Sequence, residues 1–207
     1  MLTVFGDPIS GNCYKVKLLL TQLGRPFDWV DMDVVKGETR TPEFLAMNPT
    51  GKVPLLQIEP GKWLAESNAI LCYLADGTPY LPEDRLARAE VLQWLFWEQY
   101  SHEPYIATFR FWIRYLNRAE AYRAKVEGKQ PSGYAALDRM EAELRGRNWI
   151  AGECYSIADI ALYAYTHVAE EGDFDLGRYP AIRAWFKRIE AQPGYVPMYQ
   201  EPITGSP

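Results

Sequence analysis

The chain has 207 residues, of which 48% are hydrophobic and 14% are aromatic. This length allows one large domain or two small ones, and the composition supplies a hydrophobic core and excludes an intrinsically disordered chain. The formal net charge of −5 argues against general nucleic-acid binding.

The start of the chain and its apolar runs predict a soluble, cytoplasmic protein. The first residues, Met1–Gly6, form a strand-like run with no basic segment before it, so we expect no secretory signal peptide. No apolar run approaches the roughly 20 residues that a membrane helix requires. Cys13, Cys72 and Cys154 are far apart and odd in number, which predicts free thiols. With only two histidines in the chain, we expect no metal site.

The first part of the chain alternates strand-like and helix-like segments. Short apolar runs bounded by Gly, Pro and Asp predict strands, and apolar residues at i, i+3, i+4 and i+7 predict helices. The order β-α-β-α-β-β-α indicates an α/β unit. The expected strands are Leu2–Phe5, Phe27–Val30, Pro54–Ile58 and Lys62–Leu64, and the expected helices are Val16–Leu23, Pro42–Met47 and Glu66–Ala75.

The second part of the chain predicts helices only. The turn-rich stretch Gly77–Pro82 indicates a linker, and we place the boundaries at 1–77, 78–84 and 85–207. A helical region is expected from Arg85 to about Arg118, with a kink at Pro104. Further helices are expected around Leu137–Leu144, after the capping-box sequence Ser156–Asp159, and after Tyr179–Pro180.

Two motifs in the first domain point to a binding site. The first, Asn48–Pro54, ends in Val53-Pro54, where proline favours an extended backbone and can hold a cis bond. The second, Ala65–Leu71, opens a helix at Glu66 and Ser67, where backbone N–H groups and the helix dipole attract a carboxylate. Taken singly, these are an ordinary strand entry and an ordinary helix start. Together they predict a site for a peptide-like molecule with a carboxylate end.

This pair of motifs resembles the glutathione transferases, in which the Val-Pro turn binds the cysteinyl part of glutathione and the Glu-Ser pair binds its γ-glutamyl end. The resemblance covers the whole chain, because Ser156–Asp159 is similar to the family's N-capping box and Tyr179–Trp185 to its late helix. It implies a thioredoxin-like N-terminal domain followed by an all-helical C-terminal domain. It also implies glutathione as co-substrate, no metal, and a homodimer.

The loop before the first helix offers donors for the glutathione sulfur. A free thiol with a pKa near 8.5 is only about a few per cent thiolate at neutral pH. A transferase must therefore stabilise the thiolate of glutathione. Ser10 carries a hydroxyl and Asn12 an amide, and no Tyr ends the first strand. The arrangement is most similar to the serine-type (theta-like) and bacterial nu-like classes, which implies catalytic roles for Ser10 and Asn12. The alternative is that both residues only cap the helix.

Other residues have expected roles with simpler alternatives. The resemblance implies that Lys52 contacts the glycyl carboxylate of glutathione, although it could be a solvated loop lysine. Tyr105, Phe109 and Trp112 are candidates for the electrophile pocket, although most such aromatic residues lie in a core. Cys13 is expected to be a buried structural thiol, since no second cysteine completes a Cys-x-x-Cys motif.

The predicted function is transfer of glutathione to a small hydrophobic electrophile, as in detoxification. One alternative is glutathione-dependent disulfide reduction at the same site, which Asn12 favours because nu-like relatives are associated with it. Another is a non-catalytic binding or scaffold protein that keeps the fold.

Overall fold

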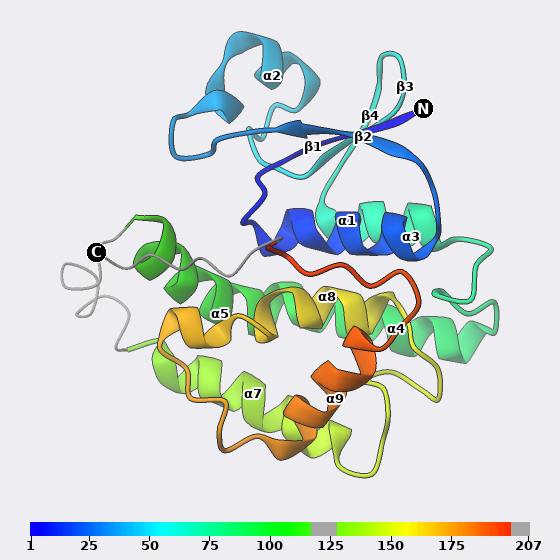
Figure 1. The fold of residues 1–207 in the computed structure, drawn as a ribbon, viewed down its shortest axis with the longest axis vertical. Coiled ribbons are helices and arrows are strands. Elements are labelled where there is room, and N and C mark those ends of the chain that lie inside the picture. Colours follow the sequence, from blue (N-terminus) through cyan, green and yellow to red (C-terminus); the bar gives the residue numbers. More distant parts are fainter. Residues whose placement is uncertain (117–127, 200–207) are drawn as a thin grey trace. The chain divides into compact units, whose positions relative to one another are not determined.

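The structure is a computed structural model that describes residues 1–116 and 128–199 (Figure 1). The chain divides into two compact units. The N-terminal unit contains Met1–Leu74 together with the segment from Gln192 onward, and the helical unit contains Ala75–Ala191. The boundaries expected from the sequence, 1–77, 78–84 and 85–207, do not include this return of the last segment to the N-terminal unit.

The N-terminal unit is built on a four-stranded mixed sheet with the strand order β2-β1-β3-β4. The first two strands are parallel, and the other two pairings are antiparallel. Every strand and helix that the sequence predicts in this region is present, with ends that differ by at most one residue except at the start of α1, which begins five residues before the expected Val16. The strands are β1 (Leu2–Gly6), β2 (Phe27–Asp31), β3 (Leu55–Glu59) and β4 (Lys62–Ala65), and the helices are α1 (Gly11–Gln22), α2 (Pro42–Met47) and α3 (Ser67–Ala75).

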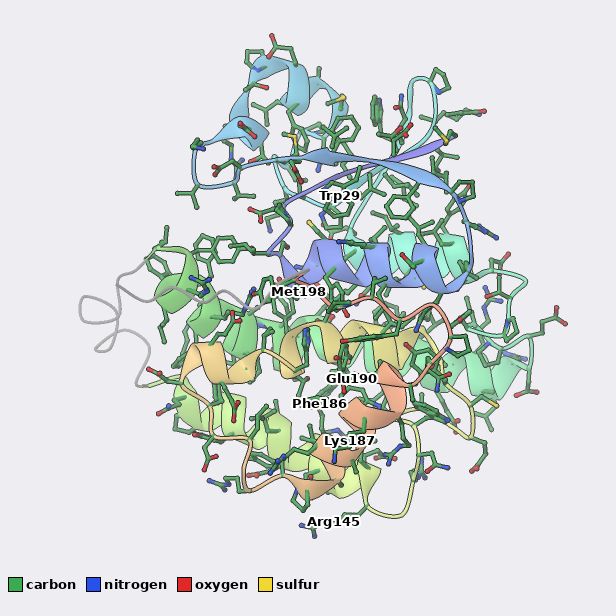
Figure 2. All side chains as sticks on the ribbon, in the orientation of Figure 1. Trp29, Arg145, Phe186, Lys187, Glu190 and Met198 are labelled. Carbon is green, nitrogen blue, oxygen red and sulfur yellow. The ribbon has the colours of Figure 1, made fainter. Side chains whose placement is uncertain are left out.

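Helix α1 packs against the sheet because one side of it is apolar. Val16, Leu19 and Leu20 are fully buried. Trp29 fills the space between β2 and α1, where its ring lies against Gly6 and below the Lys17 ammonium (Figure 2). A side chain at position 6 would collide with this ring, so the sheet and the helix approach closely at the glycine.

The segment after Gln192 packs along α1. The Tyr14 hydroxyl donates a hydrogen bond to the Val196 carbonyl oxygen at 2.7 Å, and the Met198 side chain is buried. Gly194 has a φ of 73° and lies so close to Gln22 that a Cβ would be 2.9 Å from the Gln22 Cα. A glycine is therefore required at this position by both conformation and space.

The helical unit contains no strand among its described residues, as the sequence predicts. The region expected as one kinked helix is divided near Pro104, which lies in the first turn of α5 and cannot donate to the preceding turn. A π-helical turn, Glu98–His102, precedes this break, and the expected end near Arg118 lies outside the described residues. The helices are α4 (Arg85–Trp97), α5 (Glu103–Arg110), α7 (Gln130–Leu144), α8 (Ile157–Thr166) and α9 (Pro180–Glu190).

The start of α8 forms the predicted capping box. The Ser156 hydroxyl accepts from the Ala158 N–H, and the Asp159 carboxylate accepts from the Ser156 N–H. Asp159 also accepts from the Trp185 indole N–H at 2.8 Å, which ties α9 to this helix start. Further along α9, Glu190 (Figure 2) accepts a hydrogen bond from the Tyr163 hydroxyl of α8.

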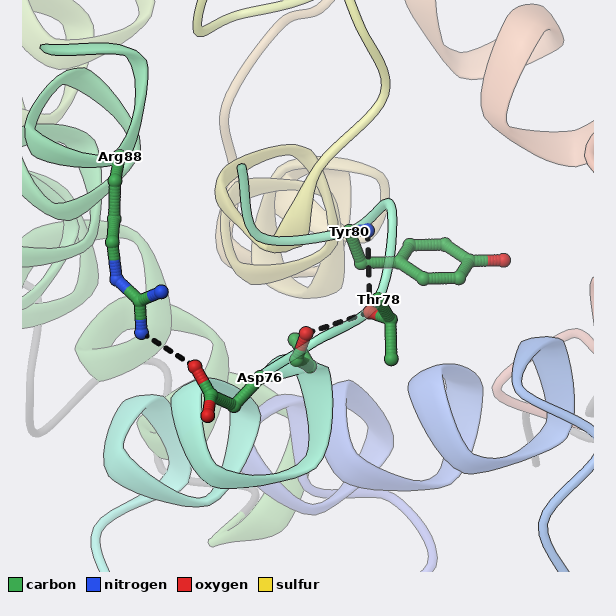
Figure 3. Close-up of polar contacts among 5 residues, drawn as sticks. Asp76, Thr78, Tyr80 and Arg88 are labelled. Carbon is green, nitrogen blue, oxygen red and sulfur yellow. Dashed lines mark hydrogen bonds and ion pairs between the residues drawn. The ribbon is translucent and has the colours of Figure 1, made fainter. Parts of the chain in front are cut away.

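The stretch that the sequence predicts as a linker is held by local hydrogen bonds (Figure 3). The Thr78 hydroxyl donates to the Ala75 carbonyl at 2.7 Å and accepts from the Tyr80 N–H at 3.3 Å. Asp76, the residue just before this stretch, accepts from Arg88 of α4 at 2.7 Å, so the start of the stretch is fixed to the first helix that follows it.

Among the described residues, no helix has the length and apolar character that crossing a lipid bilayer would require.

Candidate functional site

The register of the sheet brings the predicted site segments together at one end of its strands. Phe5 near the end of β1 pairs with Leu55 at the start of β3, and Leu55 pairs with Ala65 at the end of β4. The loop that leaves β1, the Val53-Pro54 turn that enters β3 and the Glu66-Ser67 pair that leaves β4 are therefore neighbours. Two motifs that are separate in sequence and the loop that carries Ser10 form one site in the N-terminal unit.

The Val53-Pro54 turn has the cis peptide bond that the sequence allows. Pro54 is buried and Val53 is partly exposed. Asn48 holds the turn, since its side-chain amide donates to the Lys52 carbonyl at 2.9 Å and its side-chain oxygen accepts from the Thr50 N–H. This leaves an ordered stretch of backbone beside which a peptide can bind.

Two cationic side chains flank this turn. Lys52 is exposed, which agrees both with a lysine that binds a ligand and with a solvated loop lysine. Arg40 is also exposed, and its guanidinium donates to the Thr50 carbonyl at 3.1 Å and lies over Gly51. The sequence alone does not assign Arg40, because the long connection between β2 and α2 has no spacing that fixes its position. The structure places the Arg40 guanidinium against Thr50 and Gly51, the two residues before Lys52 in the chain, and both cations could attract a carboxylate.

Glu66 and Ser67 lie at the beginning of α3. Glu66 is exposed and has a φ of 67°, a left-handed conformation that costs a non-glycine residue about 1 kcal/mol or more and is common at functional sites. Its carbonyl accepts from the Ile70 N–H, so it is the residue that caps the helix. The first N–H groups of α3 therefore lie at this end of the sheet, next to the Val-Pro turn.

Ser10 and Asn12 lie at the start of α1. Ser10 is the N-cap of this helix, and its hydroxyl oxygen accepts from the Cys13 N–H at 3.4 Å. A hydroxyl that accepts in this way still has its own proton to donate. Asn12 is directly joined to the other predicted motif, because its side-chain oxygen accepts a 3.0 Å hydrogen bond from the Ser67 hydroxyl.

Cys13 is a buried thiol, as predicted. It has no solvent exposure, and its sulfur accepts a hydrogen bond from the Asp7 N–H at 3.4 Å. Burial raises the pKa of the Cys13 thiol to about 12. At neutral pH this residue is therefore protonated and is not the nucleophile of a thiol exchange reaction.

The three candidates for an electrophile pocket differ in their surroundings within the helical unit. Phe109 of α5 is 4% exposed and packs edge-on against Phe174, with ring centroids 5.2 Å apart. Tyr105 and Trp112 are partly exposed. The pocket role of these residues remains a prediction, and burial makes Phe109 a core residue of this unit.

Comparison with known proteins identifies two family regions in the chain. Residues 1–76 match the glutathione S-transferase N-terminal domain, and residues 87–193 match the glutathione S-transferase C-terminal domain. These matches agree with a thioredoxin-like unit that carries the four-stranded sheet and a helical unit that follows it.

Three relatives illustrate the likeness. A glutathione S-transferase from Pseudomonas fluorescens Pf-5 is 54% identical, with a TM-score of 0.93 over 95% of this chain and 98% of that chain. The disulfide-bond oxidoreductase YfcG of Escherichia coli K12 is 31% identical over 93% of this chain and 92% of its own length. A glutathione transferase family member from Pseudomonas fluorescens Pf-5, solved with two glutathione molecules bound, is 28% identical, with a TM-score of 0.82 over 93% of this chain and 89% of that chain.

The two domain matches, together with relatives of this identity and coverage, show that the chain belongs to the glutathione S-transferase family.

Proposed function

We propose that this protein is a glutathione transferase that stabilises the thiolate of bound glutathione for attack on a small hydrophobic electrophile. The observation that carries the proposal is the hydrogen bond between Ser67 and Asn12. It joins a helix start suited to a carboxylate to a residue suited to a thiolate, and glutathione has both groups.

The N-terminal unit has a suitable group for each part of glutathione. The backbone beside Val53 pairs with the cysteinyl residue, and Glu66 and the N–H groups at Ser67 bind the γ-glutamyl end, where the helix dipole favours a carboxylate. Lys52 binds the glycyl carboxylate, with Arg40 beside it as a second cation.

Catalysis in this proposal comes from thiolate stabilisation and positioning. Lowering the thiol pKa by about two units corresponds to roughly 2.7 kcal/mol of preferential stabilisation of the thiolate. Hydrogen bonds from the Ser10 hydroxyl and the Asn12 amide to the sulfur, near the N-terminus of α1, can supply this amount. Tyr105 and Trp112 are the candidates from the helical unit for contact with the electrophile.

The experiment is the ultraviolet thiolate absorbance of bound glutathione across pH, for the parent, Ser10→Ala and Asn12→Ala. We expect a bound thiol pKa about two units below 8.5 in the parent, and a rise of about one unit in whichever variant removes the leading donor. Thr41→Ala is the matched control, because Thr41 also caps a helix, α2, by accepting from the Phe44 N–H. If the bound thiol has the same pKa in the parent, in both site variants and in the control, Ser10 and Asn12 only cap the helix. Binding without a lowered pKa would favour a non-catalytic protein.

Glutathione-dependent disulfide reduction is the second candidate, and the similarity to YfcG favours it. Here the glutathione thiolate attacks one sulfur of a disulfide, displaces the other sulfur as a thiolate and forms a mixed disulfide. A second glutathione thiolate then attacks the glutathione sulfur of this mixed disulfide, which gives glutathione disulfide and releases the remaining substrate sulfur as a thiolate. Cys13, the cysteine beside Asn12 in the chain, is buried and protonated, so we assign the attack to the thiol of glutathione. Rates with a small disulfide against those with chlorodinitrobenzene separate the two reactions.

We propose a homodimer, on the strength of an apolar surface on the helical unit. Leu86 and Phe96 of α4 and Tyr100 of the π-helical turn after it are large apolar side chains that are 69%, 71% and 84% exposed. A second copy of the chain is the occupant expected for such a surface in this family, and its burial would remove the apolar side chains from water. The molecular mass in solution, by light scattering, checks this assignment.

A further inference from the structure

The segment 192–199, which we call the strap, lies along α1 (Figure 1). Gly194 lies against the last turn of α1, and the Val196 carbonyl accepts a hydrogen bond from Tyr14, near the first turn. The strap therefore runs from the C-terminal end of α1 toward its N-terminal turn. Ser10, the proposed hydroxyl donor to the glutathione sulfur, caps that turn.

The sequence of the strap favours one fixed path. Pro193 and Pro197 restrict the backbone on both sides of the contact with α1, and a proline also favours an extended conformation in the residue before it, here Val196. Gly194 has the left-handed φ of 73°, and the Met198 side chain is 5% exposed. A segment restricted in this way loses little conformational entropy when it binds to the helix.

Tyr14 connects the strap to the first turn of α1. Its side chain is 2% exposed, and its hydroxyl donates to the Val196 carbonyl at 2.7 Å. Its backbone N–H donates to the Ser10 carbonyl at 2.9 Å, which is the first hydrogen bond of the helix. One residue thus joins the strap to the residue that caps the helix, although the strap lies 182 positions away in the chain.

The orientation of Ser10 depends on its backbone more than on its side chain. The Ser10 hydroxyl accepts from the Cys13 N–H at 3.4 Å, which is beyond the usual range of about 2.7–3.2 Å and is therefore a weak hydrogen bond. The backbone bonds are shorter, since the Ser10 N–H donates to the Asp7 carbonyl at 3.0 Å and the Ser10 carbonyl accepts from Tyr14. A shift of Tyr14 therefore changes where the Ser10 hydroxyl lies.

We propose that Tyr14 is a positioning residue, held by the strap, that fixes the first turn of α1 so that the Ser10 hydroxyl lies where the glutathione sulfur binds. This inference rests on the proposed function, with Ser10 as a donor to the thiolate. The strap then contributes to stabilisation of the thiolate without contact between the strap and glutathione. Binding of the two carboxylate ends of glutathione does not depend on it.

The test uses two variants that act on different ends of the contact. Tyr14→Phe removes the hydroxyl and keeps the ring. Gly194→Ala leaves Tyr14 unchanged but displaces the strap, because a Cβ at φ 73° would lie 2.9 Å from the Gln22 Cα. Thiolate absorbance against pH gives the pKa of the bound glutathione thiol. We expect each variant to raise it by about half a unit, which is about a threefold loss in the thiolate equilibrium.

Each variant has a matched control. Gly24→Ala also places a side chain at a positive φ, 61°, but a Cβ there has no atom within 4 Å. Tyr163→Phe also removes a hydroxyl that donates a hydrogen bond, to Glu190 in the helical unit. Neither control should change the pKa of the bound thiol.

Two further measurements separate positioning of Ser10 from a general loss of structure. Calorimetry with S-methylglutathione, which has no thiol to ionise, should give an affinity within about twofold of the parent for Tyr14→Phe and Gly194→Ala. In a Ser10→Ala background, Tyr14→Phe should raise the thiol pKa no further, because the group that it positions is gone. If Gly194→Ala does not fold, Tyr14→Phe with these two measurements decides.

The outcomes distinguish this inference from the proposed function. A parent that binds glutathione with a lowered thiol pKa, and a folded Tyr14→Phe with the same pKa, would overturn the role of Tyr14 and leave the transferase proposal intact. A parent that does not lower the thiol pKa would overturn both. A large loss of affinity for S-methylglutathione would show that the strap only stabilises the fold, and a pKa that still rises in the Ser10→Ala background would overturn the route through Ser10.

Discussion

Each unit of the molecule contains a charged side chain with no solvent exposure, and the two are stabilised in different ways. Asp159 of the helical unit accepts hydrogen bonds from the Ile150, Ser156 and Trp185 N–H groups at 2.8–3.0 Å. Lys15 of the N-terminal unit contacts the Ser67 and Asn68 side chains of α3 over longer distances of 3.4 Å. Short contacts to backbone and core groups indicate a structural role. These two contacts of Lys15 join α1 to the first turn of α3, at the proposed binding site.

The largest expected effect is on the stability of the helical unit. Asp159→Ala leaves three buried N–H groups without their acceptor and should lower the free energy of unfolding by about 3–5 kcal/mol. Lys15→Met should lower it by about 1 kcal/mol or less, because methionine fills a similar volume and removes a buried charge. Urea unfolding followed by circular dichroism measures both. Asp138→Ala is the control, since Asp138 is exposed and accepts from the Tyr179 hydroxyl. Equal losses for Asp159→Ala and Lys15→Met would remove the distinction between the two sites.

A smaller effect is expected on the pH dependence of stability. Burial raises the pKa of Asp159 from 3.8 to about 6, against the opposing effect of its hydrogen bonds. Between these values the folded state binds more protons than the unfolded state, so this group's contribution to stability falls as the pH rises from about 4 through 6. We expect the difference in unfolding free energy between the parent and Asp159→Asn to decrease by about 1–3 kcal/mol from pH 4 to pH 7. A difference that increases with pH would mean that the hydrogen bonds to the carboxylate outweigh the cost of its burial.

The smallest expected effect is a lack of change at Cys13. Its thiol is buried and has a pKa of about 12, whereas Cys154 is exposed. Iodoacetamide at pH 8 should label Cys154 at least about 100-fold faster than Cys13. Lys15→Met should leave Cys13 equally protected, because methionine fills a volume similar to that of lysine in the packing of α1. Peptide mass spectrometry after timed labelling gives both rates, and rapid labelling of Cys13 in this variant would indicate a general role in packing.

The sequence predicts the elements well because each carries a local signal. The apolar spacing of α1, the capping box of α8 and the turn before β4 depend on neighbouring residues, and all three are present. Pro104 likewise marks the division before α5. The sequence does not predict the π-helical turn at Glu98–His102, because a proline indicates a break in the helix but not the form that the preceding turn takes.

The site is predicted only in part, because several of its contacts are distant in sequence. Ser67 and Asn12 appear in separate motifs, and their hydrogen bond spans 55 positions. Lys15 looks like an ordinary helical lysine in the sequence, and its burial depends on where α3 lies in the folded unit. Arg40 is placed beside the Val-Pro turn by a contact with Thr50 that no motif indicates.

The return of the last segment to α1 has a consequence for how the protein is made. The N-terminal unit obtains the contacts of Gly194 and Val196 only after the helical unit has been translated. A ribosome-bound chain that has emerged only as far as Leu74 therefore contains every proposed glutathione-binding residue but not the segment that covers Tyr14 and Gln22. The order of synthesis places completion of the binding unit last, even though its residues are made first.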